Sequence, residues 1–183
     1  MARTIAVLFI LVLCFTTTMQ AQAPTPKPGP EVKKLHVLVG RWTYEGEYKP
    51  GPLGPGGKVS GEYDGRMILG GFFFEGRATE KGPAGQSRGL EIDGYDPVNK
   101  NFSYHYFMDD GSALTGALTV AGNTWTGAAK LVTAGKQYQF KGTFVLAADL
   151  ASGTFEGEIS VDGKTWTPWF EMKYTKVPPA AKK

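Results

Sequence analysis

Residues 136–175, KQYQFKGTFVLAADLASGTFEGEISVDGKTWTPWFEMKYT, decide the fold because they contain three strands and the turns between them. Apolar and polar residues alternate along this stretch, which is typical of strands with one buried and one solvated face. The segment VDGK at 161–164 predicts a tight hairpin, since Asp-Gly tolerates the positive φ that such a turn needs. We therefore predict strands at 136–146, 152–161 and 165–175.

The same alternation extends back along the chain to Gly40. No gap between these strands is long enough for a crossover helix, so we expect neighbouring strands to pair in an antiparallel meander. One short helix is predicted over residues 31–39, where Val32, Leu35 and Val39 have helical spacing. The other predicted strands lie at 41–48, 58–67, 70–78, 87–96, 101–108, 112–120 and 123–131.

One face of the predicted strands carries most of the aromatic residues. A core built only for packing favours Leu, Ile and Val, whereas tyrosine offers an apolar ring and a hydroxyl for ligand or water. Tyr95 is the one tyrosine that the alternation places on the opposite face, with Glu91, Asp93 and the pair Glu75 and Arg77. The residues assigned to the apolar face are Trp42, Tyr44, Tyr48, Tyr63, Phe72, Phe74, Leu90, Ile92, Phe102, Tyr104, Tyr106, Leu114, Leu118, Trp125, Tyr138, Phe140, Phe144, Phe155, Ile159, Trp166, Phe170, Met172 and Tyr174.

Nine glycines fall on this same apolar face by the alternation. A glycine inside a strand costs stability and usually marks a bend or a close approach. Small residues on one face let a sheet curl toward that face, as in a closed barrel. The glycines are Gly46, Gly61, Gly65, Gly76, Gly94, Gly116, Gly127, Gly142 and Gly157. The prediction is an all-β fold, an antiparallel up-and-down closed barrel of about ten strands with one short N-terminal helix.

The first 23 residues have the pattern of a signal peptide. Arg3 precedes an apolar run at 5–13, and Ala21-Gln22-Ala23 has the small-x-small pattern of a cleavage site. The run is too short for a transmembrane anchor, which needs about 20 apolar residues. We expect cleavage near Ala23 and a secreted or periplasmic protein. Cys14, the only cysteine, would be lost with the leader, so no disulfide is expected.

The rest of the chain divides into a linker, a domain and a tail. Residues 24–30 are a Pro-rich linker, 31–176 the barrel domain and 177–183 a solvated, disordered tail. The leader contains one charged residue, Arg3, so its removal lowers the net charge from +3 to +2. Such a small charge gives no argument for nucleic acid or a lipid surface, and we expect no stable membrane insertion.

Signals for metal and catalytic sites are weak. His36 lies on the predicted helix, and His105 alternates with Tyr104 and Tyr106 and should point outward. No ligand spacing surrounds either histidine, so we expect no metal and no cofactor. Glu75 and Arg77 lie on one strand face and are expected to form a solvated ion pair.

Several motifs resemble the lipocalin-like barrels. Leu35-x-x-Leu38-Val39-Gly40-x-Trp42 is similar to their entry motif, in which Gly-x-Trp opens the first strand. The segments at 68–71, 94–96 and 171–175 extend the resemblance to a bacterial family of calycin-like domains of unknown function. In lipocalins this tryptophan packs against an arginine near the end of the barrel. Here the last strand offers Lys173 and Lys176 but no arginine. The family implies no catalytic residues.

The function that these observations favour is an exported binding protein for a small apolar or amphipathic molecule held inside the barrel. One alternative is an enzyme using the same cavity, for which the predicted faces leave almost no ionisable group inside. Another is a structural or interaction module with a filled barrel, in which outward Phe73, Phe107 and Trp169 form an apolar patch. The residues predicted to line the ligand site are Trp42, Tyr44, Tyr63, Phe74, Tyr104, Tyr106, Trp125, Tyr138 and Phe140.

Overall fold

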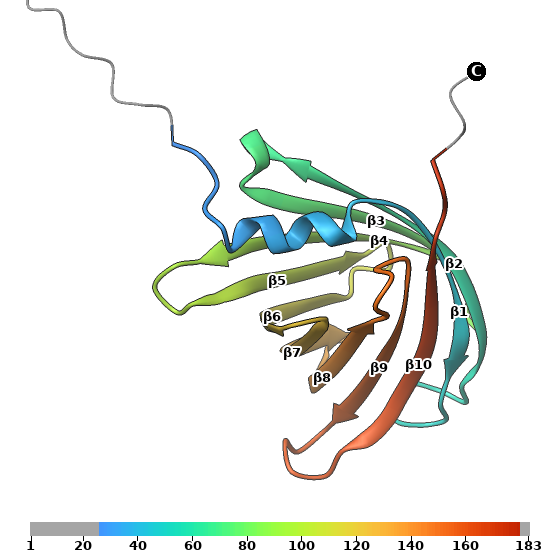
Figure 1. Ribbon diagram of the computed structural model, residues 1–183. Helices are drawn as coiled ribbons and strands as arrows, with labels where there is room; N and C mark the ends of the chain where they lie inside the picture. Colours follow the sequence, from blue (N-terminus) through green and yellow to red (C-terminus); the bar gives the residue numbers. More distant parts are fainter. Residues whose placement is uncertain (1–25, 180–183) are drawn as a thin grey trace, which may run out of the picture.

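The computed structural model describes residues 26–179, so the predicted signal peptide and the last four residues of the tail lie outside the described part. Ten antiparallel strands follow one another around a closed barrel, and β1 pairs with both β2 and β10 (Figure 1). The fold class is therefore as predicted. The strands are β1 (Gly40–Tyr48), β2 (Gly57–Ile68), β3 (Phe73–Gly82), β4 (Gly85–Asp96), β5 (Asn101–Met108), β6 (Ala113–Ala121), β7 (Thr124–Thr133), β8 (Lys136–Leu146), β9 (Ser152–Ser160) and β10 (Thr167–Lys176).

A short 3-10 helix, η1 (Val32–Leu38), lies across one end of the barrel (Figure 1). Its buried Val32 and Leu35 pack with a cluster of large side chains from the strands. Gly40 has φ +114°, a conformation that favours glycine, and this lets the chain turn from η1 into β1. The cluster that η1 covers contains Trp42, Phe74, Phe102, Trp125 and Leu146. Neither this helix nor any other in residues 26–179 has the length and apolarity to cross a membrane.

A second 3-10 turn, η2 (Leu69–Gly71), stands where the sequence predicted the start of a strand. Gly70 and Gly71 both have positive φ, so the chain cannot extend there and β3 begins at Phe73. Phe72 therefore precedes the strand rather than lying on its inner face.

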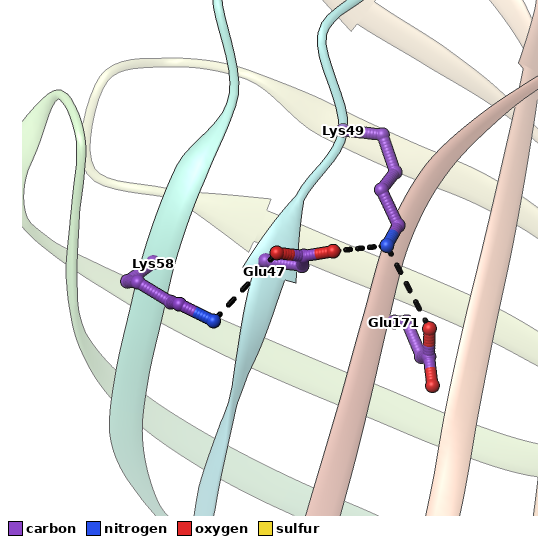
Figure 2. Close-up of polar contacts among 4 residues, drawn as sticks. All are labelled: Glu47, Lys49, Lys58 and Glu171. Carbon is purple, nitrogen blue, oxygen red and sulfur yellow. Dashed lines mark hydrogen bonds and ion pairs between the residues drawn. The ribbon is translucent and has the colours of Figure 1, made fainter.

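The pairing of β1 with β10 closes the barrel. Inside this seam the rings of Tyr44 and Tyr174 stack with their centroids 4.9 Å apart. Outside it, Lys49 contacts both Glu47 and Glu171, and the Lys58 Nζ lies 3.7 Å from a Glu47 oxygen (Figure 2). Exposed ion pairs of this kind contribute little to stability. The backbone ladder and the inner rings therefore hold the seam closed.

The predicted faces of β4 are wrong. Glu91 pairs with Gly76 and Asp93 pairs with Phe74, positions of β3 that face the interior. Glu91 and Asp93 therefore point inward, whereas Leu90 and Ile92 point outward. The strand alternates apolar with acidic residues, so hydrophobicity alone favoured the opposite choice. Register with the neighbouring strands decided it, because a shift of one residue exchanges the faces of a whole strand.

The same error explains two other misplaced residues of β4. Tyr95 points inward and packs edge-on against Phe102 with ring centroids 5.3 Å apart. Gly94 lies on the outer face, beside the ring of Phe73. The other eight glycines of the predicted set do face the interior, which supports the argument that they allow the sheet to curl.

Two tryptophans near the start of β10 also differ from prediction. A β-bulge between Pro168 and Phe170 shifts the register, and Trp169 turns inward against Tyr48 and Phe140. Trp166 precedes the strand and lies outside, where the Lys141 Nζ is 3.8 Å from its ring centroid. An apolar patch containing Trp169 is therefore excluded.

Side chains of β3 and β5 that were predicted to point outward do so. Phe73 and Phe107 are exposed to 38% and 46%. His105 points outward with its ring parallel to that of Phe107. Glu75 accepts hydrogen bonds from Arg77 Nε at 2.9 Å and from Arg66 of β2, so the predicted ion pair is present and includes a second arginine. Its carboxylate is not solvated as predicted, because Glu75 is only 8% exposed.

Candidate ligand-binding site

An inner cavity of about 100 Å³ lies within the barrel on the side nearest η1. Its wall is mostly aromatic, and Leu38 of η1 contributes to it. Five of the nine predicted site residues line it: Trp42, Tyr63, Tyr104, Trp125 and Phe140. The remaining lining residues are Glu91, Asp93, Leu118, Gly127, Gly142, Phe144, Phe155 and Tyr174.

The other four predicted site residues lie inside the barrel but do not line the inner cavity. Phe74 is fully buried in the cluster beneath η1. Tyr44, Tyr106 and Tyr138 belong to the second core cluster, in the rest of the barrel.

An outer pocket of about 370 Å³ lies at the end of the barrel opposite η1. Loops between the strands surround it, and Tyr48, Glu80 and Trp169 are among the residues that line it. Tyr44 lies between residues of the two spaces: its ring stacks on Tyr174, which lines the inner cavity, and its hydroxyl donates at 3.1 Å to Glu80, which lines the outer pocket. Tyr48 donates to the other Glu80 oxygen at 2.9 Å. The interior is thus packed in its middle and hollow on both sides.

Two carboxyl groups of β4, those of Glu91 and Asp93, line the inner cavity from adjacent inward positions. Asp93 has no exposed surface, and when both carboxyls are ionised neither of its oxygens has a hydrogen-bond donor in the described part of the chain. A buried polar group without a partner is costly, and a buried charge more so. Among the described residues that line the cavity, none is Lys, Arg or His.

The environment of these carboxyls favours their protonated forms. Burial, and then the charge of Glu91, raises the pKa of Asp93 well above its usual range. Burial also raises the pKa of Glu91, to about 7, against the lowering effect of hydrogen bonding by Asp93 and Tyr63. Two close carboxyls in a desolvated site cannot both ionise easily, so the pair is expected to hold a proton near neutral pH.

Tyrosine hydroxyls complete the polar part of the cavity. Burial is the main cause that raises the pKa of Tyr63, Tyr104 and Tyr174 well above the usual value, and the nearby Glu91 adds to it. These tyrosines therefore remain neutral and can donate hydrogen bonds to a bound molecule.

Two glycines make room for tyrosine hydroxyls in this region. A Cβ at Gly76 would collide with the hydroxyl of Tyr63, and a Cβ at Gly89 would collide with that of Tyr106. Both collisions are too close for a small adjustment. Glycine at these positions lets each phenol lie directly against the backbone of a neighbouring strand.

Sequence reasoning missed the three interior carboxylates. Glu91 and Asp93 were assigned outward with the rest of β4, and Glu80 lay beyond the predicted end of its strand at residue 78. Tyr95 carried a usable signal. Residues 91, 93 and 95 share one face of the strand, so placing Tyr95 inward with the other tyrosines would have placed Glu91 and Asp93 inward as well.

Residues 26–179, the described part of the chain, contain no group of three or more His, Cys, Asp or Glu side chains that could hold a metal ion. Both histidines lie away from the inner cavity, His36 on η1 and His105 on the outer face of β5.

Comparison with known families matches residues 27–176 to the family described as "Protein of unknown function (DUF1579)". The chain belongs to this family. The DUF1579 match extends from the segment before η1 to the end of β10, so it includes every strand of the barrel. No curated protein matches this DUF1579 chain.

One solved structure with a similar fold is the crystal structure of Rv2717c from M. tuberculosis. Its TM-score with this DUF1579 chain is 0.61, and the sequences are 12% identical over 83% of this chain and 100% of the other. At this identity the likeness establishes a common barrel fold and carries no information on function.

Proposed function

We propose that this DUF1579 protein binds a small apolar or amphipathic molecule in its inner cavity. The observation that carries the proposal is a mostly aromatic space of about 100 Å³ inside the barrel, which is also lined by tyrosines and two carboxyls. An apolar cavity of about 150 Å³ is known to admit benzene. The inner cavity is smaller than that, so one aromatic ring is the upper limit for the part of the ligand that enters, and its entry requires the side chains of the wall to move apart slightly.

The lipocalin-like resemblance supports this proposal. Lys176 lies with its Nζ 5.0 Å from the centroid of the Trp42 ring and donates to the carbonyl of Val37 at 3.0 Å. Trp42 in turn donates to the carbonyl of Leu38 at 3.0 Å. A lysine of the last strand thus makes the contact that an arginine makes in lipocalins, and we infer a calycin-type closed end that leaves the interior for a ligand.

The test is binding of toluene to the purified protein. We expect toluene to raise the melting temperature and to change the fluorescence of Trp42 and Trp125, which line the cavity. Leu118→Trp should fill the cavity and abolish binding, while the neighbouring outward change Thr119→Val should not. Failure of toluene to bind the folded wild-type protein would contradict the proposal.

Acid–base catalysis in the same cavity is a second candidate, favoured by the Glu91 carboxyl with its pKa raised to about 7. A group that exchanges a proton near neutral pH suits a general acid or base. This candidate requires that a bound molecule be converted to product and that Glu91→Gln stop the conversion. If the molecule binds but is not converted, catalysis is contradicted and only the ligand-binding proposal stands.

Export is proposed on the signal-peptide pattern of the first 23 residues. The processed protein should begin at Pro24, as N-terminal sequencing of the exported fraction would show. An exported protein that retains Met1 would refute the cleavage near Ala23.

A further inference from the structure

The carboxyl of Asp93 is the feature of the interior that the fold itself leaves unsatisfied. It is 0% exposed, it lines the inner cavity, and both of its oxygens lack a donor. An unpartnered buried acceptor of this kind loses its hydration without compensation. The one partner within reach is Glu91, which can share a proton with Asp93. When that proton is lost, a donor is expected to come from outside the chain.

The groups around the pair leave the charge of a carboxylate uncompensated. The residues paired with Glu91 and Asp93 on β3 and β5 are Phe74, Gly76, Tyr104 and Tyr106. The titratable groups that influence the pair or are influenced by it are tyrosines of three strands, Tyr63 of β2, Tyr104 and Tyr106 of β5, and Tyr174 of β10. A tyrosine donates one hydrogen bond and brings no positive charge.

An ammonium group has the properties that this site lacks. It carries a positive charge and three N–H donors, which can bond to carboxylate and phenol oxygens together. Trp42, Trp125 and Tyr63 line the cavity and provide aromatic surface of the kind that attracts a cation and packs against its apolar body. An anion would be repelled by the pair, and a neutral hydrocarbon would leave Asp93 without a donor.

We propose that the inner cavity selects a small organic amine, which binds as an ammonium ion to Asp93 and Glu91 with its apolar body against the aromatic wall. This inference rests on the proposed function and names the class of ligand. The ammonium replaces the proton that the empty pair holds, so each binding event releases that proton to solvent. The amine itself stays protonated, because alkylamines titrate well above neutral pH.

The test compares three molecules of similar size: benzylamine, benzyl alcohol and toluene. Their dissociation constants are measured by calorimetry at pH 8 and pH 6. Benzylamine is expected to bind at least ten times more tightly than the other two at pH 8. Because release of one proton changes the affinity about tenfold per pH unit, its affinity should fall about 100-fold from pH 8 to pH 6, and the affinity of benzyl alcohol should not change. Calorimetry in two buffers of different ionisation enthalpy should show release of about one proton.

Variants separate the carboxyls from the rest of the barrel. Asp93→Asn and Glu91→Gln should each remove most of the preference for benzylamine while toluene still binds, and the outward control Asp64→Asn should retain it. Toluene binding with no preference for benzylamine in the wild-type protein would overturn the amine proposal and leave the proposed function standing. Binding of none of the three molecules would overturn both. The wild-type preference and proton release decide the question even if a variant fails to fold.

Discussion

Carboxylates occupy two opposite environments in this barrel. On the outer face of the seam, Glu47 and Glu171 meet Lys49 and Lys58 in water (Figure 2). Hydrogen bonding by Lys49, and then its charge and that of Lys58, lowers the pKa of Glu47. On the inner face of β4, Asp93 has no partner and burial raises its pKa. The same functional group is thus a solvated anion on the outer side of the sheet, whereas burial favours its protonated form on the inner side.

The two environments differ in their effect on the stability of the fold. Exposed pairs such as Glu47 with Lys58 are nearly neutral for stability. An unpartnered buried carboxyl such as Asp93 is destabilising, and proteins tend to retain such violations of local rules at functional sites. The inner face of β4 is therefore the more informative of the two surfaces about function.

The largest expected effect is the pH dependence of stability. The pKa of Glu91 is raised in the folded protein, so between its usual value near 4.5 and about 7 the folded state binds more protons than the unfolded state. Stability is therefore highest in the acidic part of this window and falls as the pH rises through it. The loss is on the order of 3 kcal/mol for one group at ~1.4 kcal/mol per pH unit. Urea unfolding from pH 5 to pH 8 measures it.

Two variants, one on each face of the sheet, test whether this pH effect comes from the inner carboxyls. Glu91→Gln should flatten the pH dependence of unfolding, whereas Glu47→Gln on the outer face should leave it in place. The pKa of Glu47 is lowered, so its small contribution has the opposite sign and is lost as the pH falls. An unchanged pH profile in Glu91→Gln would contradict the environment inferred for the inner carboxyls.

A smaller effect is expected from adding volume to the inner face of β7. A Cβ at Gly127 would lie 2.7 Å from Leu118 Cδ2, so Gly127→Val should destabilise the protein by about 1–3 kcal/mol through overpacking. Thr126→Val on the exposed outer face should be nearly neutral. The measurement is the midpoint of denaturant unfolding, and equal effects of the two changes would contradict the assignment of faces on β7.

The smallest effect concerns two adjacent residues of β5. Tyr104→Phe should weaken binding of benzyl alcohol by about 0.5–1.5 kcal/mol, the value of one hydrogen bond, and should spare toluene. His105→Ala, on the opposite face, should change neither affinity. Titration calorimetry measures both. Loss of binding in His105→Ala with no effect of Tyr104→Phe would require the site to lie outside the barrel.

Alternation of residue types was enough to predict most of the architecture. The ten strands, their antiparallel order and the closed barrel follow from the period of two, the short turns and the glycines on one face. Aromatic residues of the tyrosine-rich face, such as Trp42, Tyr63 and Tyr104, do lie inside, because a large ring on a curved sheet is buried most completely on the concave side.

Only the tertiary structure decided which face of β4 points inward and how the interior is divided. Leu90 and Ile92 compete with Glu91, Asp93 and Tyr95 for the interior, and the strand by itself gives conflicting signals: hydrophobicity favours the first set, and the position of Tyr95 favours the second. Hydrogen-bonded register with β3 and β5 makes the choice for all of them at once. In the same way, the bulge at Trp169 and the stacking of Tyr44 on Tyr174 depend on strands distant in sequence, so the packed middle and the inner cavity exist only once the barrel has closed.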